Sequence, residues 1–279
     1  MSEIDKKLEE VANVVNGLHS QQRHQEHQAI LDWLTPIDYG LQQTDYIRKR
    51  QQGTGQWLLD SSQFHAWRET DKQTLFCPGI PGAGKTVLAS IIINHLSERF
   101  HTNAGIGMAY IYFNYKQNVD NQNVENLLSS ILKQLSQERS LLPDSVKALH
   151  DQYRKKRTRP SIDELSRALQ SVAALYSRVF IIVDALDECQ VTNGCRARFL
   201  TEIFNLQTKT GVNLFATSRF IPEITEMFKG STSLEIRASE EDVRRYLEGH
   251  MSKLPTFVRN SSDLQEEVKA GIVKAVDGM

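Results

Sequence analysis

Hydrophobic residues along the middle of the chain follow two alternating patterns. Short apolar runs at 74–77, 107–115, 179–183 and 212–216 predict buried strands. The segments between them space their apolar residues three and four apart, which predicts amphipathic helices at 86–99, 124–135, 161–176 and 196–206. Strands that alternate with helices in this way predict an α/β fold, with a mostly parallel sheet covered by helices on both faces as a three-layer sandwich.

The N-terminal pattern differs from that of the middle. Five apolar residues are spaced alternately by four and three: Ile4, Leu8, Val11, Val15 and Leu18. The spacing predicts a helix with a narrow seam lasting about two heptads, which is lost in a Gln/His-rich stretch at 21–28. Two interpretations stay open: a surface helix that packs on its own domain, or a helical contact with a partner or another copy.

The flanks of the central region also carry helix signals. Large apolar residues between Trp57 and Trp67 suggest a helix that packs on a core. Ser161 with Glu164 forms a capping box at the start of its helix. After Pro222, residues 234–237 predict one more strand, and helices are expected at 239–251 and from 262 onward.

Composition excludes several classes of protein. Lys plus Arg is 33 and Asp plus Glu is 34, so the formal net charge is −1, which gives no electrostatic case for nucleic acid or an anionic membrane as partner. The three cysteines are too few for a disulfide scaffold, and their spacing is not that of a metal or redox motif. The sequence shows no signal peptide and no membrane span, so we expect a cytoplasmic protein.

A phosphate-binding motif lies between the first predicted strand and the following helix. Residues 79–86 read GIPGAGKT and match G-x-x-x-x-G-K-[ST] in full. Glycines let backbone N–H groups turn toward phosphate oxygens, and the helix N-terminus adds partial positive charge. We therefore expect Lys85 to reach the β- and γ-phosphates and Thr86 to ligate Mg²⁺. The expected nucleotide-binding residues are Gly79, Pro81, Gly82, Ala83, Gly84, Lys85, Thr86 and Val87.

Acidic residues follow the third predicted strand. The run 179–183 ends at Asp184, at the sheet edge where open α/β sheets bind ligands. Asp184 would there hold the magnesium ion with Thr86, the Walker B role. Asp187 or Glu188 would orient or deprotonate the attacking water. The alternative is that Asp187 caps the next segment and Glu188 is solvated.

An arginine follows the fourth predicted strand, in the segment NLFATSR at 213–219. If this strand neighbours the P-loop strand, Arg219 would stand over the γ-phosphate and report its presence. A lone arginine at a strand end also has a purely structural interpretation.

Together GIPGAGKT, IIVDALDE and NLFATSR resemble the NACHT branch of the STAND P-loop NTPases, in its nephrocystin-type version. The lead-in GTGQWLLDSSQFHAW is similar to the corresponding segment of that group. The resemblance implies a nucleotide-controlled signalling switch that binds ATP or ADP with Mg²⁺, hydrolyses ATP slowly and self-associates in one nucleotide state. It also implies Arg219 as the γ-phosphate sensor, and contacts near the adenine from Thr54 and Gly55.

The resemblance also suggests how the chain is organised. We expect an N-terminal helix and linker at 1–30, a helical lead-in at 31–70, the P-loop NTPase core at 71–232 and the start of a helical subdomain at 233–279. Members of the family continue into a lid and a repeat sensor, so we expect either a piece of a longer protein or a minimal nucleotide module. Many NACHT domains have Gly after the magnesium aspartate, where this chain has Ala185.

Other functions stay open at this point. A turnover ATPase of AAA+ type would carry Glu directly after Asp184, at position 185. A small-molecule kinase would need an arginine-rich lid, and a GTPase would carry an NKxD motif, which does not follow the P-loop here. A scaffold that binds nucleotide without significant hydrolysis, and acts through its N-terminal helix or an effector protein, is the remaining alternative.

Overall fold

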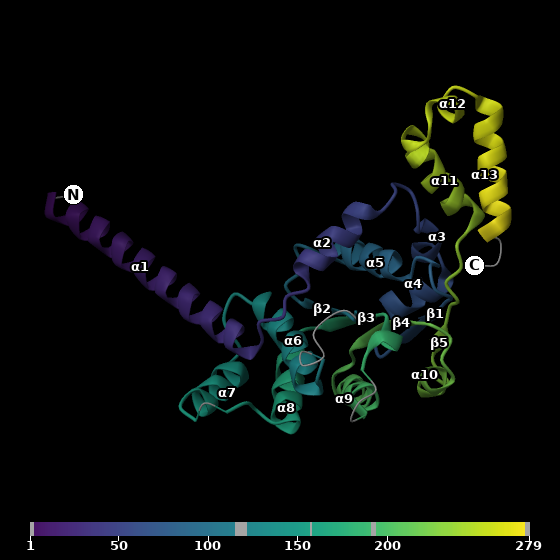
Figure 1. The fold of residues 1–279 in the computed structure, drawn as a ribbon. Coiled ribbons are helices and arrows are strands. Elements are labelled where there is room, and N and C mark those ends of the chain that lie inside the picture. The colour runs from purple at the N-terminus through teal and green to yellow at the C-terminus, as the bar shows by residue number, and fades with distance from the viewer. Residues whose placement is uncertain (1–2, 115–121, 157, 191–193, 277–279) are drawn as a thin grey trace.

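The computed structural model describes residues 3–114, 122–156, 158–190 and 194–276. Five strands form one parallel sheet in the order β2-β3-β4-β1-β5. Their bounds are β1 Thr74–Pro78, β2 Ile106–Tyr112, β3 Arg178–Asp184, β4 Asn213–Ser218 and β5 Thr232–Ser233. The α/β class and the parallel sheet predicted from the sequence are confirmed (Figure 1).

Helices cover both faces of the sheet. One face carries α5 (Lys85–Phe100), with α2 (Gly40–Lys49), α3 (Gln56–Leu59) and α4 (Ser62–Glu69) beside it. The other face carries α6 (Val124–Gln137), α8 (Ile162–Ala173) and α9 (Cys195–Thr210), with α7 (Asp144–Arg154) packed on α8. The Ser161 backbone N–H donates to Glu164 Oε2 at 2.9 Å, which confirms the predicted capping box.

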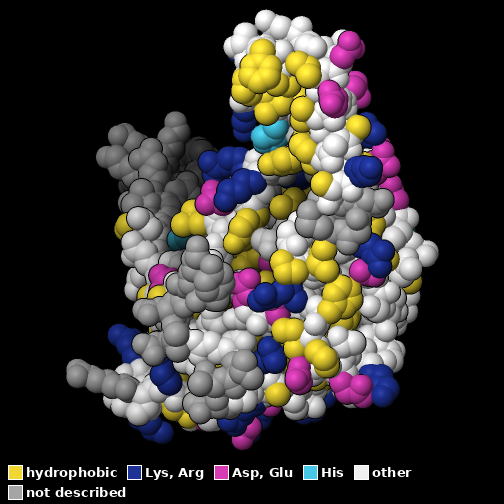
Figure 2. All heavy atoms as spheres, turned by 45° about the vertical axis from the view of Figure 1, so that its right-hand side comes forward, with side chains coloured by type: hydrophobic (Ala, Val, Ile, Leu, Met, Phe, Trp, Pro, Cys, Tyr) yellow, Lys and Arg dark blue, Asp and Glu magenta, His cyan; other side chains and the backbone are white. Residues whose placement is uncertain are grey.

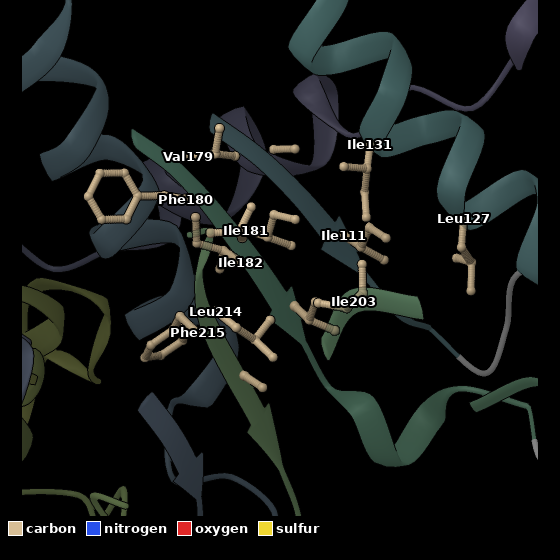
Figure 3. Packing of buried hydrophobic residues seen from close by; sticks show 14 of the residues in the cluster. Ile111, Leu127, Ile131, Val179, Phe180, Ile181, Ile182, Ile203, Leu214 and Phe215 are labelled. Carbon is tan, nitrogen blue, oxygen red and sulfur yellow. The ribbon is translucent and has the colours of Figure 1, made fainter. Parts of the chain in front are cut away.

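The core follows the alternation of the strands. Phe180 and Phe215 project to one side of the sheet, where the Trp67 ring of α4 lies 5.1 Å from Phe180. Ile111 and Ile203 lie on the opposite side (Figure 3). Strand β3 is buried along nearly its whole length, so side chains from both helical layers meet on it and fix its register.

The N-terminal helix is longer than the seam predicted. Helix α1 runs from Glu3 to Leu34 and continues through the Gln/His-rich stretch. It extends away from the sheet (Figure 1), and its buried side chains, among those that the structure describes, are Ile30, Leu31 and Leu34 in the last turns. Val15 and Leu18 are exposed, whereas the side chains of Ile4, Leu8 and Val11 lie outside the described residues.

The C-terminal segment differs in part from expectation. The prediction of a strand at 234–237 is wrong, because the last strand, β5, ends at Ser233. Leu234 and Ile236 still donate backbone N–H groups to the carbonyls of Phe76 and Pro78. The segment after Ser233 thus donates hydrogen bonds to β1, but Pro78 has no N–H with which to return one, so the regular strand pairing ends.

Beyond this segment the chain forms small helices that stand away from the sheet (Figure 1). These are α11 (Glu240–His250), η4 (Met251–Lys253), α12 (Thr256–Arg259) and α13 (Ser262–Val276), whereas α10 (Pro222–Met227) precedes β5. They expose the large hydrophobic side chains of Tyr246, Phe257, Leu264 and Ile272. In Figure 2 hydrophobic side chains gather in the upper part of the molecule. Among the described residues, no helix combines the length and hydrophobicity needed to cross a membrane.

Candidate nucleotide-binding site

Three neighbouring strands end at one edge of the sheet, and a loop follows each of them. Strand β4 lies between β1 and β3, with Pro78 in register with Ser218. The P-loop after β1 therefore lies next to Arg219, which follows β4, and Asp184 ends β3 one strand further on. The condition set from the sequence, that the arginine's strand neighbours the P-loop strand, is met.

The P-loop has the backbone conformation that its glycines permit. Gly82 and Gly84 have φ of +84° and +88°, a region that other residues rarely adopt. Nothing lies within 4 Å of where their Cβ atoms would be, so the loop is open on that side. Gly84 is the N-cap of α5, whose 16 residues begin at Lys85. Within the same segment Pro81 is exposed, Ala83 buried and Val87 half-buried.

The first glycine of the loop is required by close packing. A Cβ on Gly79 would lie 2.5 Å from the carbonyl oxygen of Ile236. The Gly79 N–H donates to the Ser218 carbonyl at 3.0 Å. The start of the P-loop is thus fixed between the end of β4 and the segment that leads to the C-terminal helices.

Lys85 lies across the loop and faces several charges. Its Nζ donates to the carbonyls of Gly79 and Ile80, each at 2.8 Å. Burial lowers the pKa of Lys85, and the carboxylates of Asp187, Asp184 and Glu188 oppose that shift. Arg219, which follows β4, also contributes as a like charge that lowers the pKa of Lys85. The charged residues expected from the sequence therefore converge on one place.

The side chain of Asp184 is buried at the end of β3. Its side chain accepts a hydrogen bond from Thr217 Oγ1 at 2.6 Å and another from Thr86. The residue is only 1% exposed. Burial raises the pKa of Asp184 to about 6, although both hydrogen bonds and Lys85 favour the charged form. A buried carboxylate of this kind is stable as an anion only with a cation close by.

The residues around Asp184 suit a magnesium ion. Mg²⁺ prefers oxygen ligands, and a carboxylate and a threonine hydroxyl meet here beside the phosphate loop. Thr86 and Asp184 therefore have the donor chemistry that the sequence assigned to them. Among the described residues, there is no group of three or more His, Cys, Asp or Glu that could hold a metal by themselves. This fits an ion held mainly by phosphate and water.

Asp187 and Arg219 form a two-point ion pair. The Arg219 backbone N–H donates to Asp187 Oδ1 at 2.9 Å, and its Nε donates to Oδ2 at 2.5 Å. The Asp187 side chain is 2% exposed, whereas that of Arg219 is 50% exposed. Asp187 is therefore occupied in orienting the arginine, and this pair raises the pKa of Arg219.

Glu188 lies on the short 3-10 helix η2 (Leu186–Glu188) that follows β3. The turn starts at Ala185, which adopts φ of +54° and ψ of +49°. The Ala185 N–H donates to Thr217 Oγ1 at 2.9 Å, and its carbonyl accepts from the Glu188 N–H at 2.8 Å. Glu188 is half-buried, and its charge acts to raise the pKa of Lys85. This turn brings the acidic residues back toward the P-loop.

Thr54 and Gly55 lie in the loop that connects α2 to α3. This loop contacts α5 and also α11. A Cβ on Gly55 would lie 2.5 Å from Ile91 Cδ1, so the loop packs directly on the P-loop helix. The Gly55 N–H donates to Asp242 Oδ2 at 2.9 Å, and Trp57 Nε1 donates to the same oxygen at 3.2 Å. The Thr54 hydroxyl donates to the Gln51 carbonyl at 2.8 Å.

Sequence reasoning missed three contributors to this site. Thr217 joins β4 to Asp184, and its only signal was a hydroxyl at the end of an apolar strand. Asp242 fastens α11 to the loop at 53–57 and carried no signal, because 187 residues separate it from Gly55. Tyr46 of α2 has its pKa raised by burial and by the nearby charges of Asp184 and Glu188, so it faces the same site.

These features define a P-loop NTPase: a glycine-rich loop between strand and helix, and acidic and basic residues at the ends of the adjacent parallel strands. The model of the N-terminal region of nephrocystin 3 matches residues 53–219, more than half of the chain. The chain belongs to this nephrocystin-type, NACHT-related family, as its motifs predicted. No curated protein sequence matches it.

Solved structures with a similar arrangement are distant in sequence. An AMPPCP-bound DnaA from Aquifex aeolicus shares 14% identity over 82% of this chain and 63% of its own, with a TM-score of 0.40. The ORC1 protein of Aeropyrum pernix, solved with DNA, shares 15% over 81% and 54%, with a TM-score of 0.45. A Walker-type ATPase of Pyrococcus abyssi shares 13% over 79% and 64%, with a TM-score of 0.48. The chain thus spans between about half and two thirds of the length of these proteins.

Proposed function

We propose that this chain is a nucleotide-controlled signalling switch of NACHT/STAND type, which binds ATP or ADP with Mg²⁺ and hydrolyses ATP slowly. The observation that carries the proposal is the convergence of Lys85, Asp184, Asp187, Glu188 and Arg219 beside an open P-loop. A cation, a buried carboxylate and an oriented arginine next to backbone N–H groups form a set suited to phosphate and its metal.

Each residue has a role in this proposal. The loop from Gly79 to Val87 would surround the phosphates, with Lys85 leaving the Gly79 and Ile80 carbonyls to bind phosphate oxygens. Thr86 and Asp184 would hold Mg²⁺, which neutralises phosphate charge when bound. Glu188 would orient or deprotonate the attacking water, since Asp187 is occupied by Arg219.

Arg219 would act as the γ-phosphate sensor. It is half exposed and already aimed by Asp187, so the guanidinium N–H groups not used in that pair can meet a phosphate. Thr54 and Gly55 would lie near the adenine, because their loop packs on the face of α5 and is fastened to α11 by Asp242. Nucleotide contact at this loop would therefore be transmitted to the C-terminal helices.

Turnover is expected to be well below the roughly 1–100 s⁻¹ of kinases. The alternative of a turnover ATPase of AAA+ type requires a glutamate after Asp184, where this chain has Ala185 in a left-handed conformation. Rapid steady-state hydrolysis by the purified monomer would favour the alternative, and nucleotide binding without any hydrolysis would favour a scaffold.

The proposal divides the chain into an N-terminal helix and linker at 1–30, a lead-in at 31–70, the NTPase core at 71–232 and a helical subdomain at 233–279. It includes self-association or an effector contact through α1, whose Val15 and Leu18 are 42% and 61% exposed. It includes no nucleic-acid or membrane partner, because the net charge is −1. Charges of both signs alternate over the face shown in Figure 2.

Replacement of Lys85 by alanine should remove nucleotide binding. The loss of a charge-assisted contact to phosphate is expected to weaken ATP and ADP by at least about a hundredfold, or about 2.7 kcal/mol. Calorimetry on protein freed of co-purified nucleotide measures this directly. Lys229→Ala is the matched control, since the Lys229 side chain is 76% exposed in the turn after α10 and pairs only with Glu226 among its described contacts. A wild-type protein that binds neither nucleotide would refute the proposal.

The Arg219→Ala variant separates sensing from binding. Because Arg219 would contact the γ-phosphate alone, affinity for ATP should fall about tenfold while affinity for ADP changes by less than about twofold. The control is Arg23→Ala, an exposed arginine on α1. Titration with ADP and a non-hydrolysable ATP analogue provides the comparison. An equal loss of affinity for both nucleotides would show that Arg219 supports the structure of the site and does not sense the γ-phosphate.

Self-association is tested on the exposed residues of α1. The wild-type chain should have a higher mass by light scattering with a non-hydrolysable ATP analogue than with ADP. Val15→Glu combined with Leu18→Glu should remove this difference, because charges on a narrow apolar seam oppose helix pairing. Leu141→Glu, at a residue 74% exposed elsewhere on the surface, serves as control. A mass that is the same in every nucleotide state would leave α1 as a surface helix.

A further inference from the structure

A cavity of about 420 Å³ lies at the end of the sheet opposite the P-loop. It is built from the last turns of α5, the start of β2, β3 with the segment before it, and the end of α6. Helix α5 has 16 residues and spans about 24 Å, so the P-loop and the cavity lie at its two ends. Small-molecule sites occupy about 300–1,000 Å³. The cavity is therefore separate from the nucleotide site and large enough for a small organic molecule.

The floor of the cavity is apolar. Six hydrophobic side chains form it: Leu96, Phe100, Ile106, Met108, Tyr176 and Phe180. Met108 and Phe180 are in register on β2 and β3, so they lie on the same face of the sheet. The Phe100 ring stacks on the Phe180 ring, with centroids 6.0 Å apart. The Tyr176 hydroxyl donates to the Leu135 carbonyl at 2.5 Å, so its ring is the part left to meet a ligand. The floor thus suits a flat apolar body.

The rim of the cavity has a negative potential. Glu138, the C-cap of α6, is the one carboxylate among the described lining residues, and none of these is Lys or Arg. Helix α5 ends at Phe100 beside the same cavity, so two helix C-termini with partial negative charge converge there. His101 Nδ1–H donates to the Glu98 carbonyl at 2.8 Å, which leaves Nε2 of the neutral ring as an acceptor. A positive group is therefore favoured at this rim.

Two arginines lie near the cavity without lining it. The Arg139 Cζ is 5.1 Å from the centre of the Tyr176 ring, and the Arg99 Cζ is 5.8 Å from that of Phe100. These are cation–π contacts, and the same class of attraction is open to a ligand cation on the floor.

The charge of Glu138 is not compensated by a cation of the protein. Within the described part of the chain, no lysine or arginine forms an ion pair with it. Partial burial raises the pKa of Glu138 to about 7, against the Met108 backbone N–H, which favours the charged form. A carboxylate that loses water without gaining a cation is destabilised when charged. A ligand that brings a cation to the rim would remove this penalty.

We propose that this cavity binds a small organic cation, a protonated arylalkylamine. The aromatic body would lie on the apolar floor, and the ammonium group would meet the Glu138 carboxylate and the helix-end carbonyls. An ammonium has three N–H donors and no acceptor, which suits a rim made of acceptors. The carboxylate without a partner cation and the two converging helix C-termini favour this class of ligand over a neutral or anionic one.

Met108 reports directly on this cavity. The chain has five methionines, of which Met108 lines the cavity, whereas Met227 and Met251 lie in α10 and η4. The full chain is labelled with carbon-13 at its methionine methyl groups, and the Met108 signal is assigned with Met108→Leu. Phenethylamine is then titrated at about pH 8, above the pKa of Glu138 and below that of an alkylammonium.

The Met108 signal should shift with a dissociation constant of about 1 mM or below, while the signals of Met227 and Met251 stay in place. Phenethyl alcohol has nearly the same shape without the charge, and it should bind at least about tenfold more weakly. Equal affinities for the amine and the alcohol would overturn the inference. So would an unmoved Met108 signal, or equal shifts of all the methionine signals.

Glu138→Gln separates the carboxylate from the rest of the cavity. The amide keeps the shape of the side chain, so the variant should bind phenethylamine as weakly as the wild type binds phenethyl alcohol. Its affinity for the alcohol should not change. The control is Glu223→Gln, at an exposed glutamate of α10, which should bind both probes like the wild type. An unchanged affinity of Glu138→Gln for the amine would overturn the inference. All titrations are made without nucleotide, so their outcome is independent of the proposed function.

Discussion

The buried carboxylate of Asp184 is the constraint on which this site depends. It ends β3 at 1% exposure, with hydrogen bonds from Thr217 of β4 and Thr86 of α5. A carboxylate removed from water carries a penalty of several kcal/mol unless hydrogen bonds and a cation compensate it. Because the compensating groups come from a neighbouring strand and from the P-loop helix, the charge ties the relative positions of all three elements together.

The surrounding charges follow from this arrangement. With β4 between β1 and β3, the arginine after β4 lies beside the P-loop, where Asp187 holds it in a fixed orientation. In the proposed switch this ion pair already orients the sensor before a γ-phosphate arrives. In the proposed switch Glu188 is the acidic residue left to act on the attacking water, because Asp187 is held by Arg219.

Much of the fold was predictable because its signals are local. The β-branched run that forms β3, the glycines of the P-loop and the Ser161 capping box each depend on residues close in sequence. Contacts between distant segments were not predictable. Asp242 reaches Gly55 across 187 residues. The extra turns of α1 were missed because polar residues obscure helical periodicity without preventing a helix.

The most direct test of the account is the magnesium dependence of nucleotide affinity in the wild-type chain and in Asp184→Asn. The amide preserves the shape of the side chain and its acceptor for Thr217, but it removes the charge that would hold the ion. If Asp184 holds the ion, magnesium should strengthen ATP binding to the wild type by at least about tenfold. Asp184→Asn should gain little from magnesium, and the two proteins should have similar affinities for ATP in its absence. An equal magnesium effect in the two proteins would contradict it.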